Sequence, residues 1–486
     1  MMSALYSSTA AKNYRDFSPH VPSWVLALQA FFFAILYAVW ALPETILIRH
    51  ICLIVGALLS LWTIYQYRRS FFQRRAIPVW LIATLFAWAT FHLFFLSNDF
   101  AAQYEEYTSI WKRTALGAIF ALGFGIALST YSRKKESKGK VVWAMIYLGL
   151  LAPILIYIVK YVLTNYGVQK GWVFPDYWKL YYGSLPFYIP KTAYVCFCLP
   201  TLAVALGQLA HNIHQHQAFK WANLVYLATI PAVLFVFYGE NIKNGVVYSA
   251  VLLALFLGLL IFRNFRRYWL IKLLTLGLVL VIAGLFVVNS VQKNDSWRTL
   301  SADIKIARDT QTYSHWKSSG AQALPNNEFG TMVSVTNYYR LAWGKEGIKL
   351  IIQNPLGYGL IERSFGHLAK INWPDSNLHQ SHSGWIDLTL GLGIPGFLLI
   401  FTVLLSLLYQ LAKLANSADI VANPYPLVVW WALFSLLIMW CTTEISQKVY
   451  FDDLIFWLSL GVGLCLGRAN QQIHSGAKAK SGSLAT

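Results

Sequence analysis

Long apolar runs follow one another along most of the chain, with short polar segments between them. The first run covers about Trp24 to Leu42, and similar runs recur until Phe451 to Leu466. A stretch of about 18 or more apolar residues can cross a hydrocarbon layer of ~30 Å as an α-helix. The pattern therefore predicts an all-α polytopic membrane protein with about twelve transmembrane helices.

One long polar segment, about Ser290 to Ser383, interrupts this pattern between the ninth and tenth predicted spans. Charges at helical spacing predict a surface helix at Asp303–Asp309, and a second helix is expected at Asn337–Gln353. The second helix should end at Asn354-Pro355, because the residue before a proline avoids the helical conformation. The residues expected to share one face of this helix are Tyr339, Trp343, Ile348 and Ile352.

Clusters of basic residues set the expected sidedness of the chain. Arg68, Arg69, Arg74 and Arg75 crowd one short loop. Cytoplasmic loops carry an excess of lysine and arginine, so this loop and both termini are expected inside and the long polar segment outside. The predicted organisation is transmembrane helices one to nine in residues 1–289, a large helical outer loop at 290–383, helices ten to twelve at 384–467 and a cytoplasmic tail at 468–486.

The composition narrows the function classes. Hydrophobic residues make up 57% of the chain and charged residues 12%, against roughly a quarter charged in soluble domains. The formal charge of +19 follows from the basic inner loops, so nucleic-acid binding is not expected. All five cysteines fall in apolar runs, which argues against disulfides and soluble zinc sites. No Gly-x-x-x-x-Gly-Lys loop occurs, so the substrate or a gradient must supply any energy.

Several cations are expected outside, against the trend that places positive charge in the cytoplasm. Such cations need an anionic partner, and an anion at the membrane surface is the simplest one. Arg340 is the strongest candidate, because a guanidinium matches two phosphate oxygens at once. The alternative is a surface pair with Glu346. The other outer cations near helix ends are Arg113, Lys191 and Lys243.

Two histidines stand just before the tenth predicted span. His382 lies at the mouth of that span, and His379 precedes it by three residues. An imidazole can take a proton from a hydroxyl near neutral pH, so His382 is a candidate general base. A purely structural histidine is the alternative. The aromatic loop from Asn165 to Lys191 predicts an interfacial belt, or else a surface that lines sugar or lipid.

Three motifs in and after the polar segment resemble the bacterial O-antigen ligase superfamily. They are Tyr339-Arg340-x-x-Trp343, Pro355-Leu356-Gly357-Tyr358-Gly359, and His382 followed eleven positions later by Gly393 with Pro395-Gly396. The superfamily comprises O-antigen ligases, O-antigen polymerases and O-linked oligosaccharyltransferases that glycosylate proteins. The resemblance covers about Lys243 to Gly396 and reaches the rest of the chain through the predicted topology alone.

The resemblance implies a GT-C-type membrane glycosyltransferase of the bacterial inner membrane, with its active site facing the periplasm. Such enzymes transfer a whole glycan from undecaprenyl diphosphate, with inversion and without a metal ion or other cofactor. His382 would be the essential histidine and Arg340 the arginine at the diphosphate. The family's second arginine is replaced here by Lys243, with Arg113 and Lys191 as further diphosphate ligands. Residues that would support the site are His379, Tyr339 and Asp387.

The acceptor hydroxyl is expected on a serine or threonine of type IV pilin or another protein. His382-Ser383-Gly384-Trp385-Ile386-Asp387 and Gly393-Ile394-Pro395-Gly396 resemble the pilin-glycosylating branch, as do Ser296-Trp297-Arg298 and Asp309-Thr310. Lipid A core ligases more often have asparagine after the histidine. An O-antigen ligase that acts on lipid A core, an O-antigen polymerase and a lipid-linked sugar transporter remain open alternatives.

Overall fold

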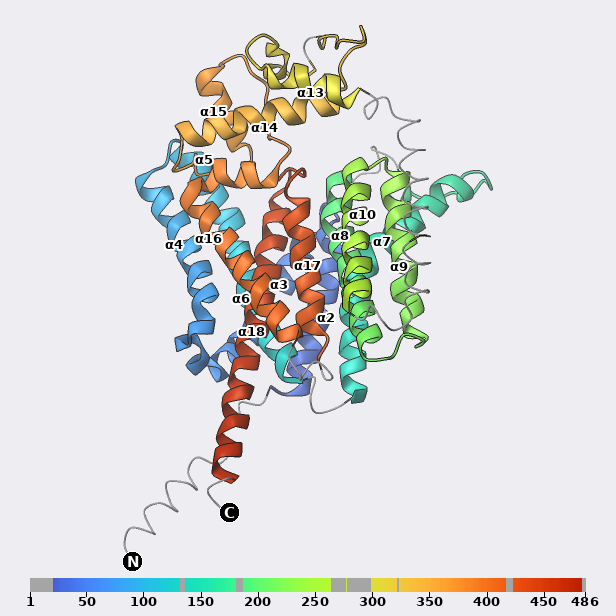
Figure 1. Cartoon of the computed structure of the whole chain (residues 1–486), viewed down its shortest axis with the longest axis vertical. Coiled ribbons are helices and arrows are strands. Elements are labelled where there is room, and N and C mark those ends of the chain that lie inside the picture. The colour runs from blue at the N-terminus through green and yellow to red at the C-terminus, as the bar shows by residue number, and fades with distance from the viewer. Residues whose placement is uncertain are drawn as a thin grey trace, which may run out of the picture.

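The computed structural model of the chain describes residues 21–131, 136–180, 187–263, 277, 299–320, 323–416 and 423–482. Within these ranges the regular structure is helical, apart from one isolated β-bridge between Asn326 and Met332. The helices of the bundle are α2 (Ser23–Trp40), α3 (Ile46–Gln66), α4 (Ile77–Phe95), α5 (Phe100–Glu106), α6 (Lys112–Tyr131), α7 (Glu136–Val162), α8 (Lys191–His214), α9 (Ala222–Gly239), α10 (Lys243–Arg263), α16 (Gly384–Ala415), α17 (Tyr425–Met439) and α18 (Lys448–Gly482). The helices beyond one end of the bundle are α13 (Leu300–Arg308), α14 (Val335–Gln353) and α15 (Ser364–Asn372), as Figure 1 shows.

Ten helices in the described part of the chain are long and apolar enough to cross a membrane. The 15 residues of α17 form a shorter apolar helix at the eleventh predicted span. The predicted ninth span, about Leu270 to Val288, lies outside the described residues, as does Ser296-Trp297-Arg298. The prediction of an all-α polytopic membrane protein is confirmed.

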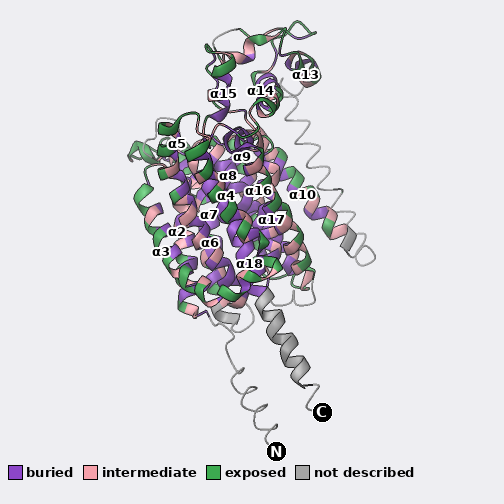
Figure 2. Cartoon of the chain, turned by 90° about the vertical axis from the view of Figure 1, so that its left-hand side faces the viewer, coloured by how far each residue is buried: buried purple, intermediate pink, exposed green. Residues whose placement is uncertain are grey.

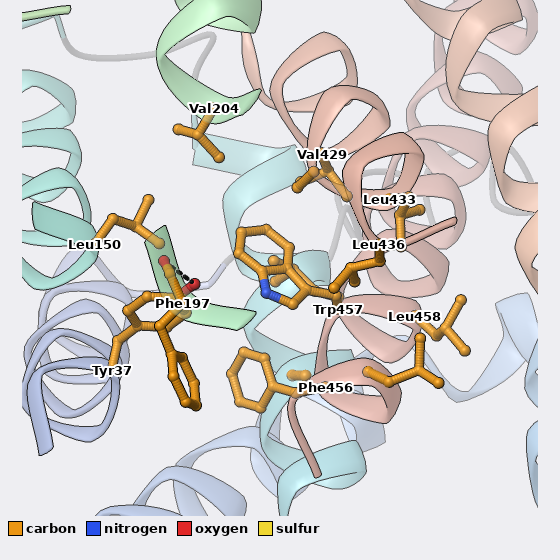
Figure 3. Close-up of a cluster of buried hydrophobic side chains, with 14 of the residues drawn as sticks. Tyr37, Leu150, Phe197, Val204, Val429, Leu433, Leu436, Phe456, Trp457 and Leu458 are labelled. Atoms are coloured by element: carbon orange, nitrogen blue, oxygen red, sulfur yellow. Dashed lines mark hydrogen bonds between the residues drawn. The ribbon is translucent and has the colours of Figure 1, made fainter. Parts of the chain in front are cut away.

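The core of the bundle forms around α8 and the Lys448–Arg468 part of α18, whose apolar residues are almost all buried. Figure 3 shows aromatic side chains from three helices meeting there, with the Tyr37 Oη donating a hydrogen bond of 3.2 Å to the carbonyl oxygen of Phe197. Helices α6 and α18 approach closely at Gly125 and Gly463, where an added Cβ would strike the backbone of the facing helix. Small residues permit such backbone contact, and dispersion forces between well-packed helices stabilise it in lipid.

The outer segment of residues 299–383 folds around its own small core beneath α13, α14 and α15 (Figure 2). Asp303 of α13 is fully buried and accepts hydrogen bonds from the side chains of Asn327 (3.2 Å) and Asn337 (3.0 Å) and from the backbone of Ser334 (3.1 Å). The expected surface helix therefore exists, but its first aspartate joins three segments instead of facing water.

The prediction that four residues of α14 share one face is wrong. Tyr339 and Trp343 are each 6% exposed, whereas Ile348 and Ile352 are 54% and 73% exposed. At 3.6 residues per turn, nine positions separate Tyr339 from Ile348 by about half a turn. The aromatic pair therefore faces the interior, and the isoleucines face outward.

A glycine-rich loop docks the outer segment onto α16. Gly393 has φ 70° and interrupts α16, which leaves the carbonyl groups of the preceding turn without helical partners. The backbone N–H groups of Tyr358 and Gly359 donate to the carbonyl oxygens of Leu390 and Gly391, each at 2.8 Å. In the opposite direction, the backbone N–H of Ile394 donates a hydrogen bond of 2.8 Å to the carbonyl oxygen of Pro355. The Pro355–Gly359 motif and the Gly393 region thus form the two sides of one backbone junction.

A carboxylate from α5 holds the end of the same loop. Glu106 is buried and accepts hydrogen bonds from the backbone N–H groups of Ile361 and, at 3.3 Å, Glu362. Burial raises the pKa of the neighbouring Glu362 carboxyl, while the positive charge of Lys448 acts in the opposite direction. The loop is therefore fixed at one end by α16 and at the other by α5.

Gly357→Ala should destabilise the protein. Gly357 has φ 85°, and an added Cβ would meet the backbone of Gly391 and Gly393. The left-handed conformation alone costs a non-glycine residue roughly 1–2 kcal/mol, and the collision adds to that cost. The melting temperature in detergent, followed by tryptophan fluorescence, should fall.

The matched control is Gly344→Ala, inside α14. No atom lies within 4 Å of its added Cβ, and alanine in place of glycine stabilises a helix by up to ~1 kcal/mol. Equal melting temperatures for the two variants would contradict the proposed importance of the junction.

Candidate active site

The turn that carries His382 is clamped between α16 and the α17–α18 connection. His382 has φ 60°, a left-handed conformation that reverses the chain just before α16 and that histidine adopts more readily than most residues. Gly384 donates its N–H to Thr443 O at 2.8 Å, and Trp385 donates to Trp440 O at 3.2 Å. A side chain at Gly384 would collide with the ring of Trp440. The glycine after the histidine therefore allows the two segments to touch.

The side chain of Asp387, in the first turn of α16, stabilises the turn that carries His382. It is buried, and its Oδ1 accepts a hydrogen bond of 2.8 Å from the backbone N–H of Ser381. Its other oxygen has no hydrogen-bond partner among the described residues. Glu444 lies close enough for the two carboxylates to repel each other. Asp387 thus positions the backbone on which His382 sits.

His382 is paired with Glu444. The imidazole Nδ1 and the Glu444 Oε2 are in direct contact as a hydrogen bond or ion pair, with His382 34% and Glu444 15% exposed at the side chain. This pairing leaves Nε2 as the nitrogen that can exchange a proton with a ligand. An acid held at one ring nitrogen fixes the tautomer and stabilises the imidazolium that forms when the other nitrogen accepts a proton.

Aromatic rings of α14 orient the histidine from its other side. The Trp343 ring stacks on His382 with centroids 5.1 Å apart and planes 20° from parallel. Tyr339 stacks in turn on Trp343 at 4.7 Å, and its Oη accepts a hydrogen bond of 3.1 Å from Gly320. The outer segment and the membrane helices thus both contribute to the site.

Arg340 is partly buried and makes no hydrogen bond or ion pair with any residue that the structure describes. The alternative pairing with Glu346 is not formed, because the Glu346 carboxylate binds Thr310 and Lys349, each at 2.5 Å. Lys243 lies close enough to Arg340 for the two cations to repel each other. An anion between them would relieve this repulsion.

Contacts of α10 connect these cations to the histidine. Tyr248 interacts electrostatically with Arg340, and its Oη donates to Met439 O at 3.0 Å and contacts Thr443 Oγ1 at 3.1 Å. Asn244, next to Lys243, donates to the same Thr443 oxygen at 3.2 Å. Thr443 precedes Glu444, so the cation pair and the His382–Glu444 pair border one short stretch of chain.

Three other predicted residues have different surroundings. Arg113 forms an ion pair of 2.5 Å with buried Asp452 of α18. Lys191 is exposed at the start of α8 and lies near Glu240. Burial raises the pKa of the Glu240 carboxyl, and the positive charge of Lys191 acts in the opposite direction. His379 is exposed.

Glu444 is the residue that sequence reasoning missed. It lies 62 positions from His382, in a short connection between two apolar runs, where its acidity was the one available signal. Among the described residues no group of three or more His, Cys, Asp or Glu could hold a metal ion. The arrangement offers a proton acceptor beside two cations, which suits the transfer of a group away from an anionic leaving group.

Arg340→Ala should weaken the binding of inorganic pyrophosphate to the detergent-solubilised protein. A hydrogen bond to a charged group contributes about 1.5–3 kcal/mol, so the loss should be at least about tenfold. Arg340→Lys should lose less, because it keeps the charge but not the planar fork.

Arg308→Ala is the control, because this exposed arginine lies elsewhere on the outer segment. Equilibrium binding of labelled pyrophosphate gives the readout. Unchanged affinity in Arg340→Ala would show that the free guanidinium does not bind phosphate.

A comparison with protein families finds a match in the part of the chain that carries the site. Residues 227–401 match the family model described as O-Antigen ligase, Wzy_C, a range that includes Lys243, Arg340, His382 and the Gly393 junction. No curated protein matches the chain. The match supports a membrane glycosyltransferase of the O-antigen ligase and polymerase type. Residues 227–401 are thus similar to the O-antigen ligase family, within which the sequence motifs also fall.

Proposed function

We propose that the protein transfers a glycan as one unit from undecaprenyl diphosphate to a hydroxyl group on the periplasmic face of the bacterial inner membrane. The observation that carries this proposal is the His382–Glu444 pair beside Arg340 and Lys243, two cations that repel each other and of which Arg340 has no partner among the described residues. The O-antigen ligase match supports the choice of a lipid-linked glycan as donor.

The proposed chemistry forms one bond and breaks one bond. The acceptor oxygen attacks the anomeric carbon from the face opposite the diphosphate, which inverts the configuration. The acceptor proton passes to Nε2 of His382, and Glu444 stabilises the resulting imidazolium. The bond between the anomeric carbon and the diphosphate oxygen breaks, and the electron pair leaves with undecaprenyl diphosphate.

Arg340 and Lys243 act on the leaving group. Negative charge grows on the bridging oxygen as the bond breaks, and preorganised cations stabilise that charge more strongly in the transition state than in the ground state. Arg113 stays a candidate ligand as well, although its Nε is already paired with Asp452. Lys191 stays a candidate ligand for a more distant part of the donor.

The preferred acceptor is a serine or threonine of type IV pilin or another protein. The support is the local sequence after His382, in which Ser383 stands where lipid A core ligases more often have asparagine. Lipid A core and the end of a growing O-antigen chain are the alternatives. The sidedness rests on the basic α3–α4 connection, which lies at the end of the bundle opposite α13–α15 (Figure 1).

His382→Ala should abolish transfer, since general-base catalysis contributes about 10²–10⁴-fold to the rate. Glu444→Gln should lower kcat by a smaller factor, because it keeps a hydrogen-bonding partner without the charge. The assay uses the purified full-length protein with a lipid-linked glycan and measures initial rates on a pilin peptide and on lipid A core.

His216→Ala is the matched control, because this exposed histidine follows the carboxyl-terminal end of α8 and should retain full activity. Loss on pilin alone supports the protein acceptor, and loss on lipid A core alone supports the ligase alternative. Wild-type rates in folded His382→Ala would overturn the proposed mechanism.

A further inference from the structure

An exposed apolar patch lies where α14 and α15 end. Its members are large aliphatic residues with exposed fractions of 54% for Ile348, 73% for Ile352, 45% for Leu356 and 66% for Ile371. Leu341, 39% exposed, lies on the same face of α14 about two turns before Ile348. Surfaces that face water rarely contain so many large aliphatic side chains close together, so we expect an apolar partner to cover the patch.

The patch is continuous across the two helices. The side chain of Asn372 donates a hydrogen bond of 3.2 Å to Gln353 Oε1, which joins the end of α15 to the end of α14. Ile371 and Ile352 directly precede these two residues in the sequence. The α14–α15 patch is defined as Ile348, Ile352, Leu356 and Ile371, exposed residues on or just beyond two helices whose ends this bond joins.

Lipid-facing aromatic residues lie next to this patch. The outer end of α4 exposes Phe94 and Phe95, at 60% and 73%, and α5 exposes Phe100 and Tyr104, at 52% and 50%. Phe94 lies near Phe100, with ring centroids 6.3 Å apart, so the aromatic surface runs from α4 onto α5. Helix α4 is one of the membrane-spanning candidates, which identifies its exposed aromatic face as a lipid contact.

Two observations connect the aromatic surface to the patch. Asp99, between α4 and α5, interacts electrostatically with His367, and His367 lies one helical turn before Ile371 on α15. Figures 1 and 2 both place α15 beyond α5 on the same side of the molecule. The patch therefore begins where the lipid-facing surface of the bundle ends.

We propose that the α14–α15 patch is seated in the outer leaflet of the bilayer, beside α4 and α5. The continuity with the aromatic surface favours lipid over a protein partner as the occupant. Exposed Lys370 directly precedes Ile371 on α15, and a cation at the edge of an apolar surface is attracted to anionic headgroups.

This seating has a consequence for the site. Tyr339, Arg340 and Trp343 lie on the amino-terminal half of α14, and Ile348 and Ile352 lie on its carboxyl-terminal half. A rigid helix with one half held in lipid fixes the height of its other half above the bundle. The proposal does not depend on the glycan-transfer reaction, since it follows from exposure and position alone.

Fluorescence quenching tests the proposal on the full-length protein in phospholipid nanodiscs. Single cysteines are introduced as Ile352→Cys, Leu356→Cys and Ile371→Cys and labelled with bimane, with Cys441→Ser removing the exposed native thiol. Gln311→Cys is the control, because it is exposed at the turn after α13. Phospholipids brominated near the headgroup should quench the three patch labels and not the control, whereas iodide in the buffer should quench the control most strongly.

Three results would overturn the proposal. One is iodide quenching of the patch labels as strong as that of the Gln311→Cys label. Another is protection of the patch that appears only when pilin is added, which would make it an acceptor-docking surface. The third is protection that grows with the number of protein copies per nanodisc, which would make it a self-association surface. Two patch positions that agree suffice if a third variant fails to fold.

Discussion

The structure depends on one backbone contact, in which the start of α16 pairs with the connection between α17 and α18. Gly384 and Trp385 donate to the carbonyl groups of Thr443 and Trp440, and the missing side chain of Gly384 lets the Trp440 ring approach. A shift in this contact would move His382 away from Glu444 and Trp343 together. The histidine is therefore held by main-chain geometry first and by its side-chain partners second.

Charge inside the bundle follows a different rule from charge at the site. Arg113 and Asp452 neutralise each other, and Glu106 is satisfied by backbone N–H groups, because an isolated charge in a medium of low polarity is costly. Arg340 instead makes no ion pair with any described residue and lies close enough to Lys243 for the two positive charges to repel each other. An arrangement that is unfavourable in the empty protein becomes favourable once an anion binds, which is the property that a diphosphate site requires.

Helix α14 links the proposed site to the proposed lipid contact. Its inner face carries Trp343, which stacks on His382, and its outer face carries the exposed isoleucines of the proposed lipid contact. The Pro355–Gly359 loop then ties the end of the same helix to the break in α16. One helix thus takes its orientation from the membrane, from the bundle and from the site.

The sequence alone determined the all-helical membrane class, because lipid leaves a spanning chain few ways to satisfy its backbone hydrogen bonds. It also predicted the end of α14 at Asn354-Pro355, and it singled out Arg340 and His382 from their chemistry and family motifs. Local pattern could not pair His382 with Glu444, engage Arg113 with Asp452 or bury Asp303, since each depends on residues far apart in the chain. The predicted common face of Tyr339 and Ile352 was wrong, because tertiary packing buries the side of α14 that carries Tyr339 and leaves Ile352 exposed.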